Sequence, residues 1–269
     1  MIRQPAVAGQ FYSSLEKTLL EEVTALIDKK SVKERAIGVV SPHAGYIYSG
    51  RVAGSVLASI EPRPIYIIMG PNHTGLGSAF SLSPSESWKT PLGNVRVNNT
   101  VRDKLKSISR WMKEDKLAHA SEHSIEVQLP FLQVIQKEFT FVPIVISHAS
   151  IEIYKEIGKE LASVIKDLKL EKEITIVASS DMTHYEEHEA AKKKDASAIK
   201  AILDLDEDML VRNIQKYDIT MCGYAPTAIM LVASKELGAK SARLIKYETS
   251  GDTSGDYSSV VGYAGILIT

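Results

Sequence analysis

The order of the hydrophobic segments constrains this chain more than any other feature of its sequence. Short runs rich in Val and Ile alternate with longer stretches in which apolar residues recur at helical spacing, as between Leu161 and Leu168. Strands that alternate with helices are typical of a largely parallel sheet covered by helices. The sequence therefore predicts an α/β fold.

The apolar runs predict six strands, at Ala36–Val40, Ile65–Met69, Phe139–Ile146, Ile174–Ala178, Ala242–Tyr247 and Val260–Thr269. The periodic stretches predict eight helices, at Leu15–Lys29, Gly50–Ser59, Thr100–Ser109, Ser124–Gln136, Ile153–Leu168, Ala190–Leu203, Asp206–Lys216 and Pro226–Leu237. The segment Ser78–Val97 is interpreted as an antiparallel excursion outside the main sheet. No linker, repeat or low-complexity tract divides the sequence, so we expect residues 1–269 to form one domain.

Charge and composition exclude several classes of partner. The 32 Lys and Arg residues balance 33 Asp and Glu residues without a basic tract, so nucleic acid is not an expected partner. No apolar stretch approaches the roughly 20 residues that span a bilayer, and the N-terminus lacks the order of a signal peptide, so no membrane contact is expected. Cys222 is the single cysteine, which excludes an intrachain disulfide and favours a cytoplasmic location.

Three of the predicted strands end in the same way, with a histidine in a polar loop. The loops deliver His43, His73 and the pair Asp181 and His184. Loops at the carboxyl ends of parallel strands converge on one crevice. A single histidine is more often a satisfied loop or core residue, but three loops of the same pattern favour a shared site. Two imidazoles from neighbouring strands form half of a site for iron, copper, zinc or nickel.

Two further segments each allow two interpretations. Cys222 precedes the predicted helix that starts at Pro226, and the positive end of that helix would lower the pKa of the thiol and favour a thiolate ligand. The alternative for Cys222 is a small buried hydrophobic side chain. Asp252 and Asp256 lie in a glycine-rich loop, which is either a pair of plain turns or a wall of the site.

The carboxylates near the histidines also have structural alternatives. Asp181 and His184 lie three residues apart, a spacing at which both can face one site or at which the carboxylate can orient the imidazole; the alternative is a helix N-cap followed by a solvated first turn. Glu122 and His123 precede an amphipathic helix, where capping chemistry explains most of the segment.

The blocks of sequence around these residues resemble the Memo-like family, the relatives of the mediator of ErbB2-driven cell motility. The resemblance runs nearly end to end and in the family's order, through RQPAVAGQFY, SPHAGYIYSG, GPNHTG, EHSIEVQLPF, SSDMTHY, MCGYAP and SSVVGYAGIL. It implies a single-domain, three-layer α/β/α sandwich with a mostly parallel or mixed central sheet, like that of the LigB-like class III extradiol dioxygenases.

The resemblance also implies a metal site. It assigns three metal ligands, His43, His73 and Cys222. It assigns three catalytic groups that line the same pocket, Asp181, His184 and His123. The implied cofactor is a transition metal, iron(II) first and copper next. The dioxygenases use two histidines and a carboxylate, whereas the third ligand here is a thiolate, which argues against ring cleavage.

The function implied by the resemblance is that of a non-haem iron- or copper-dependent redox enzyme, an oxidoreductase that acts on an unknown small molecule. Two alternatives stay open: a metal-binding protein without turnover, and an adaptor that binds a peptide or protein in the same crevice. Thr74 and the pair Tyr224-Ala225 replace a His and an Arg-His pair of the motility-factor relatives, which weakens the adaptor alternative. The resemblance also implies partners: prokaryotic-type members of the family look like companions of a radical-SAM protein and an AMMECR-domain protein in a shared pathway.

Overall fold

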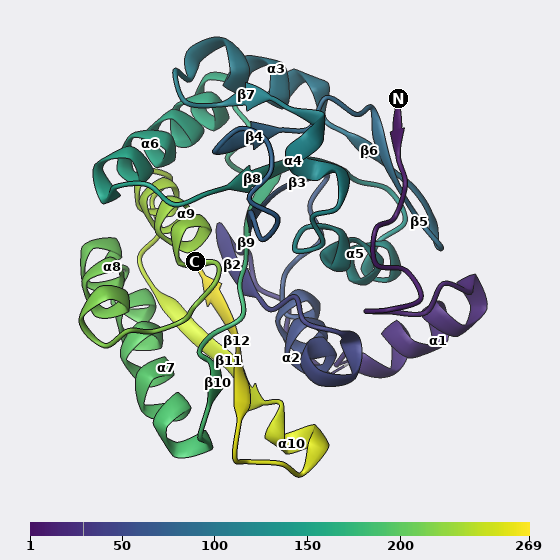
Figure 1. Cartoon of the computed structure of the whole chain (residues 1–269). Coiled ribbons are helices and arrows are strands. Elements are labelled where there is room, and N and C mark those ends of the chain that lie inside the picture. The colour runs from purple at the N-terminus through teal and green to yellow at the C-terminus, as the bar shows by residue number, and fades with distance from the viewer. Residues whose placement is uncertain (29) are drawn as a thin grey trace.

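The computed structural model describes residues 1–28 and 30–269, and its strands form one twelve-stranded mixed sheet (Figure 1). The strands are β1 (Ile2–Arg3), β2 (Gly38–Ser41), β3 (Ile65–Pro71), β4 (Phe80–Leu82), β5 (Ser87–Thr90), β6 (Gly93–Val97), β7 (Lys113–Glu114), β8 (Thr140–Ile146), β9 (Ile174–Ser179), β10 (His184–Glu186), β11 (Ala242–Thr249) and β12 (Val260–Ile268). Their order is β1-β5-β6-β8-β3-β9-β2-β12-β10, with β11 beside β12 and with β4 between β7 and β8.

The centre of this sheet is parallel. β9 pairs with both β2 and β3, and β3 pairs with β8, all in parallel register. β12 adds antiparallel pairing on the other side of β2. The six predicted strands are confirmed, and no end is displaced by more than two residues. The α/β class predicted from the sequence is therefore confirmed.

Ten α-helices are present in the described residues. They are α1 (Glu16–Leu26), α2 (Tyr46–Ala58), α3 (Asn99–Ile108), α4 (Lys116–Ala120), α5 (Leu129–Ile135), α6 (Ile151–Asp167), α7 (His188–Leu203), α8 (Glu207–Lys216), α9 (Tyr224–Glu236) and α10 (Gly251–Ser254). The predicted end of the first helix, Lys29, lies outside the described residues. None of the helices in residues 1–28 and 30–269 is long and apolar enough to cross a membrane.

Three predicted helix boundaries are wrong: α2 begins at Tyr46 and not at Gly50, and the other two concern prolines. The expected helix Ser124–Gln136 is a 3-10 turn at Glu126–Gln128 followed by α5. Pro130 lies in the first turn of α5 and has no N–H to continue a helix from the preceding turn. Pro226 does not start its helix, because α9 begins two residues earlier, at Tyr224. A proline is still tolerated in this first turn, because the N–H that it lacks would have no partner within the helix.

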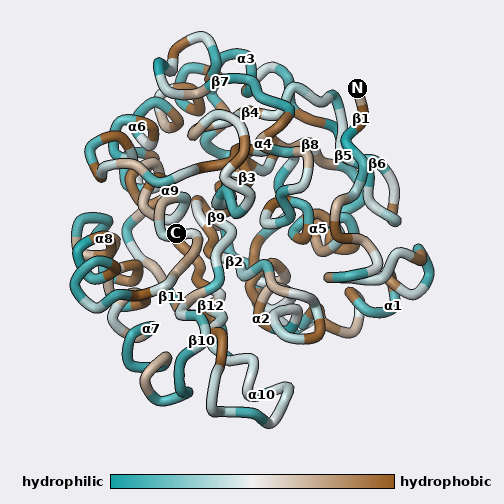
Figure 2. The backbone as a smooth tube through the Cα atoms, in the orientation of Figure 1, coloured by the Kyte–Doolittle hydropathy of each residue, from teal (hydrophilic) through white to brown (hydrophobic). Residues whose placement is uncertain are grey.

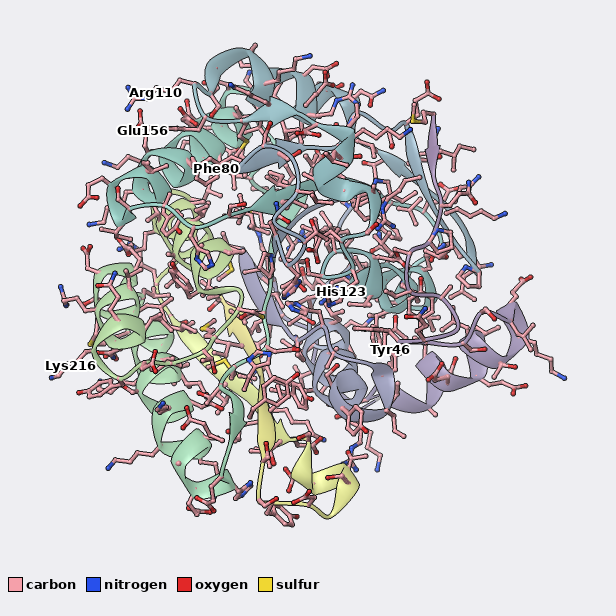
Figure 3. All side chains as sticks on the ribbon, viewed as in Figure 1. Tyr46, Phe80, Arg110, His123, Glu156 and Lys216 are labelled. Atoms are coloured by element: carbon pink, nitrogen blue, oxygen red, sulfur yellow. The ribbon has the colours of Figure 1, made fainter. Side chains whose placement is uncertain are left out.

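The sheet has an apolar cluster on each face. In β3, Ile67 and Met69 belong to the cluster that includes residues of α3, α6, α7, α8 and α9, whereas Tyr66 and Ile68 belong to the cluster that includes residues of α1, α2 and α5. Burial of each such side chain contributes about 1.5–3 kcal/mol. Figure 2 shows hydrophobic residues both in the central strands and on the helices that cover them, and Figure 3 shows Lys216 directed outward. Helices thus cover both faces, which gives the expected three layers.

The segment Ser78–Val97 is part of the main sheet, so the prediction that it lies outside that sheet is wrong. Its hairpin of β5 and β6 is antiparallel as expected. However, β6 pairs in parallel with one end of β8, and β4 pairs antiparallel with the other end. The edge of β8 would otherwise expose unpaired backbone groups, and these two strands satisfy them.

A buried polar network ties the N-terminal segment to the loop before α5. The Arg3 guanidinium forms an ion pair of 2.5 Å with the Glu126 carboxylate and donates to the carbonyl oxygen of Glu122. It also lies 4.0 Å above the ring of Trp88. The Tyr12 hydroxyl donates to the same Glu126 carboxylate. This network holds in place the loop that contains Glu122 and His123.

Removal of the Arg3 charge tests how much this network contributes to the stability of the protein. Arg3→Met keeps the apolar stem but leaves the buried Glu126 carboxylate without its counter-charge, so we expect the free energy of unfolding to fall by about 3–5 kcal/mol. Urea denaturation followed by circular dichroism measures it. Lys200→Met, which breaks an exposed ion pair with Asp204, is the control and should cost about 0.5 kcal/mol or less. Equal losses for the two variants would contradict a stabilising role for the network.

Candidate metal centre

The loops after three adjacent parallel strands carry the candidate ligands and their neighbours. β9 lies between β2 and β3 in the sheet. His43 follows β2, His73 follows β3, and Asp181 follows β9. Cys222 comes from the segment just before α9, which packs against β9. Four segments that are far apart in the sequence therefore meet at one edge of the sheet.

The structure brings together His43, His73 and Cys222 as a group able to hold a metal ion. One potential ligand atom of each residue lies within 4.8 Å of the others. The Cys222 Sγ lies 3.2 Å from Nε2 of His43, and the rings of His43 and His73 are 5.1 Å apart at 76°. Two imidazole nitrogens and one sulfur suit transition metals and are poor ligands for magnesium or calcium. Three protein ligands also leave coordination positions for other molecules.

The hydrogen bonds around His43 determine which of its nitrogens is available. Ser179 Oγ donates its one proton to the carbonyl oxygen of Ser124 at 2.6 Å and accepts from the Gln128 side-chain amide at 2.8 Å. His43 Nδ1 lies 2.9 Å from the same oxygen and must therefore be the donor. The lone pair of His43 is then on Nε2, the nitrogen that faces Cys222.

Glu122 orients His73 in the same manner. Its Oε1 lies 3.0 Å from His73 Nδ1, and its Oε2 accepts the backbone N–H of His73 at 2.7 Å. Burial acts to raise the pKa of Glu122, but the hydrogen bond with His73 and further backbone donors outweigh burial and hold that pKa at about 2. The ionised carboxylate keeps the proton on Nδ1 and leaves the Nε2 lone pair free for a metal. Sequence reasoning treated Glu122 as a capping residue and missed this role.

A second group of potential ligands, formed by His73, Glu122 and His123, does not have the features of a metal site. The two oxygens of Glu122 already accept four N–H groups: His73 Nδ1 and the backbone N–H groups of His73, His123 and Ser124. A carboxylate that is saturated by N–H donors has little capacity left for an ion. Glu122 is therefore an orienting group and not a ligand.

The predicted pKa of Cys222 is wrong in direction. Burial, together with the nearby Asp181 carboxylate, raises the pKa of the thiol well above its usual range. The backbone N–H of Asp181 donates to Sγ at 3.3 Å, but this bond and the start of α9 at Tyr224 do not offset the desolvation. The thiol is protonated at neutral pH, and metal binding there would release its proton.

Asp181 and His184 do not pair with each other. The Asp181 carboxylate accepts the backbone N–H of His43 at 2.7 Å, and burial raises its pKa to about 6 against the effect of that bond. Nδ1 of His184 donates to the carbonyl oxygen of Thr220 at 2.9 Å. The interpretation in which Asp181 orients His184 is therefore wrong, and Asp181 instead holds the His43 loop. The N-cap alternative is also wrong, because Glu187 caps α7.

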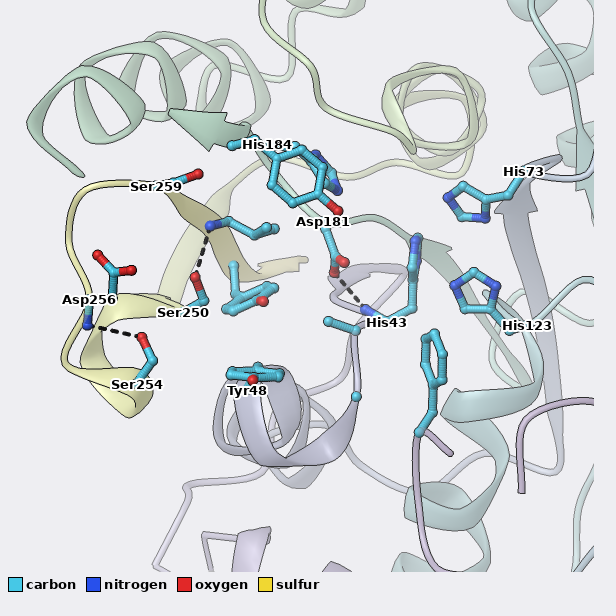
Figure 4. Close-up of a pocket in the computed structure, with 16 residues that line it drawn as sticks. His43, Tyr48, His73, His123, Asp181, His184, Ser250, Ser254, Asp256 and Ser259 are labelled. Carbon is cyan, nitrogen blue, oxygen red and sulfur yellow. Dashed lines mark hydrogen bonds between the residues drawn. The ribbon is translucent and has the colours of Figure 1, made fainter. Parts of the chain in front are cut away.

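A cavity of about 590 Å³ opens beside the ligand group (Figure 4). His43 and His73 form part of its wall, together with all three predicted catalytic groups, Asp181, His184 and His123. The ring of His123 stacks on that of His73 at 4.7 Å, and burial lowers its pKa, so that the ring is neutral. The predicted residues thus share one site.

The C-terminal glycine-rich loop contributes to this cavity in part. Asp256 lines the far side of the cavity, as the wall interpretation expects. Asp252 instead accepts the backbone N–H of Thr249 at 2.7 Å, as the turn interpretation expects. The two aspartates of the loop therefore differ in role.

The fold and the site together define an α/β protein with a His, His and Cys group at the carboxyl ends of parallel strands. The chain matches the sequence profile of the family described as Memo-like protein from residue 3 to residue 267. It is 45% identical over 271 residues to a MEMO1 family protein of Methanosarcina acetivorans, with 99% of each chain covered. It is 42% identical over 281 residues to the MEMO1 family protein MK0963 of Methanopyrus kandleri, also with 99% of each chain covered. The chain therefore belongs to the Memo-like protein family, as the resemblance predicted.

A solved structure supports the fold at lower sequence identity. The uncharacterized protein JW3007 from Escherichia coli K12 superposes with a TM-score of 0.57 at 13% identity. The superposition covers 87% of this chain and 100% of that chain. At this identity the likeness concerns the arrangement of helices and strands, which is the α/β fold with a large mixed sheet.

The orienting role of Glu122 is testable through metal affinity. Glu122→Gln keeps the size of the side chain but removes its charge and turns an amide group toward N–H donors. We expect the affinity for Co(II) to fall by about 10- to 100-fold, the usual effect of removing the partner of a ligating histidine. Competition with a chromophoric chelator measures it, with the exposed Glu152→Gln as control. Unchanged affinity in the E122Q protein would show that Glu122 only organises its own loop.

Proposed function

We propose that this protein is a metal-dependent redox enzyme in which His43, His73 and Cys222 hold iron(II) or copper. The observation that carries the proposal is the position of two of the three ligands, His43 and His73, on the wall of a cavity of about 590 Å³. A cavity of that size accommodates a small organic molecule. A protein that only stored a metal would not need space for a substrate beside it.

The ligand atoms favour iron or copper over hard, redox-inactive ions such as magnesium and calcium. Thiolate and imidazole ligands suit copper and iron, whereas carboxylate and water suit magnesium and calcium. A bound iron or copper ion would supply the one-electron chemistry that none of the surrounding side chains offers. The thiolate in place of a carboxylate argues against ring cleavage in the manner of the extradiol dioxygenases.

His184 is the residue that we assign to proton transfer. Its Nδ1 proton is committed to the carbonyl oxygen of Thr220, so its lone pair is on Nε2. The ring lines the cavity and is only partly buried. A neutral imidazole with a free Nε2 can accept a proton from a substrate and return it to a product. His123, which is kept neutral by burial, lies on the side of His43 that is opposite to His184 (Figure 4).

A second candidate function is copper binding without turnover. It is favoured by the placement of Cys222, which lies beside His43 but is not among the described residues that line the cavity. A sulfur ligand that is shielded from the cavity suits the retention of Cu(I). In that case the cavity would be used for the entry of the metal and not for a substrate.

Oxygen consumption separates these two functions. Protein loaded with iron(II) under anaerobic conditions and freed of unbound metal should consume dioxygen in the presence of ascorbate and a suitable member of a panel of phenols and amines. His73→Ala should abolish this activity through loss of the metal. If the loaded protein is inert with the whole panel while it binds Cu(I) tightly, the enzyme proposal fails and the second candidate gains support.

The role of His184 predicts a different pattern. His184→Gln should retain bound metal but reduce the turnover rate by about 100-fold or more, since proton transfer commonly contributes that much. His188→Gln is the control, because His188 bonds to Thr249 outside the cavity. Metal content by mass spectrometry and initial rates by oxygen electrode check the prediction. A rate like that of the control variant would remove His184 from the mechanism.

A further inference from the structure

The cavity continues well beyond the candidate metal ligands. Figure 4 shows His73 and His123 at one end of the cavity and Ser254 and Asp256, in the loop around α10, at the other end. A ligand that fills the cavity therefore has one part near the imidazoles and another part near α10. The residues at the α10 end decide which second part is accepted.

The wall of the cavity carries negative charge without a balancing cation. Among the described residues that line it, none is Lys or Arg, whereas Asp181 and Asp256 are carboxylates. Asp256 is exposed at the rim of the cavity. The hydroxyl and the backbone N–H of Ser258 donate to its Oδ1, which lowers the pKa of Asp256. Within the described residues these bonds engage Oδ1 and leave Oδ2 for a ligand.

The serine hydroxyls at the same end do not select a charge. Ser250 Oγ accepts the backbone N–H of Val261 at 3.0 Å, and Ser254 Oγ accepts the backbone N–H of Asp256 at 3.1 Å. A hydroxyl both donates and accepts, so either an amine or a carboxylate could bond to these groups. The sign of the preferred charge is therefore set by the Asp256 carboxylate.

Aromatic side chains add to the preference for a cation. Tyr48 and Tyr185 line the cavity from exposed positions, and Tyr263 lines it from a buried position. The faces of aromatic rings attract ammonium groups. Tyr185 has a φ of 59°, at a register shift between β10 and β12, and is 79% exposed. This conformation is uncommon for a bulky residue, and its occurrence on the wall of a cavity points to a contact with a ligand.

We propose that the cavity binds substrates that carry a protonated amine, with the ammonium group at the α10 end. There the ammonium group meets the Asp256 carboxylate and the serine hydroxyls, and the tyrosine rings line the same cavity. A carboxylate or phosphate at the same place would face Asp256 without a cationic side chain to offset the repulsion. The inference rests on the proposed function only for the orientation of the substrate, whose other end faces the candidate metal ligands.

Three probes of the same frame test this charge preference. Tyramine, 4-ethylphenol and 3-(4-hydroxyphenyl)propionate share a phenol ring and differ in the charge of the tail, which is positive, neutral and negative. Binding is measured by calorimetry at low ionic strength, on the metal-free protein and on protein loaded with zinc, which cannot oxidise the phenol. We expect tyramine to bind about tenfold more tightly than the propionate, with 4-ethylphenol between them.

Variants of Asp256 locate the source of the preference. Asp256→Asn keeps the acceptor for Ser258 and should reduce the gap between tyramine and the propionate to about threefold or less, because the charge is lost. Asp256→Lys should reverse the order of the two probes. Asp204→Asn, which removes an exposed carboxylate at the end of α7, should leave the order unchanged.

The proposal is overturned if the propionate binds the wild-type protein as tightly as tyramine, or if the order of the probes survives Asp256→Lys. Absence of saturable binding by all three probes in both forms also overturns it. The ranking is obtained without oxygen chemistry. A clear preference for tyramine in a protein whose iron form is inert to dioxygen would therefore refute the proposed function and keep this inference. Oxygen consumption by a protein that shows no preference for tyramine would refute this inference and keep the proposed function.

Discussion

The hydrogen bonds that His43 and His73 donate from Nδ1 determine what this site can bind. Each bond ends on an acceptor that cannot give a proton back: the Ser179 hydroxyl is committed to the carbonyl of Ser124, and Glu122 is an ionised carboxylate. Both rings therefore keep their lone pairs on Nε2, and in His43 this nitrogen lies beside Cys222. If either proton moved to Nε2, a donor N–H would point at the ion and the group would lose a ligand.

Two features of the fold, the pairing of the central strands and a buried ion pair, hold the site in place. Parallel pairing of β9 with β2 and β3 places the His43 and His73 loops next to each other, and the Arg3 and Glu126 ion pair holds the loop that supplies Glu122. Buried charges are costly unless they are paired and hydrogen-bonded, and here they are both. The N-terminal segment thus contributes to the orientation of His73. Among its described residues, Phe11 is the one that lines the cavity.

The sequence predicted the parts of this protein that depend on local pattern. The β-branched runs located the central strands, and histidines after three of them located the site. Tertiary surroundings decided what the pattern could not: burial reversed the expected pKa shift of Cys222, and the folded loop turned Glu122 from an apparent cap into the partner of His73. The pairing of β4 and β6 with β8 escaped prediction because it joins segments that are far apart in the sequence.

The central claim is that two imidazoles and one thiolate bind a common metal ion. X-ray absorption of the metal bound to protein that was purified anaerobically without a histidine tag tests this most directly. The account predicts one sulfur neighbour at about 2.3 Å and at least two nitrogen neighbours with imidazole scattering, and loss of the sulfur neighbour in Cys222→Ser. A metal surrounded by oxygen and nitrogen alone in the wild-type protein would contradict the account.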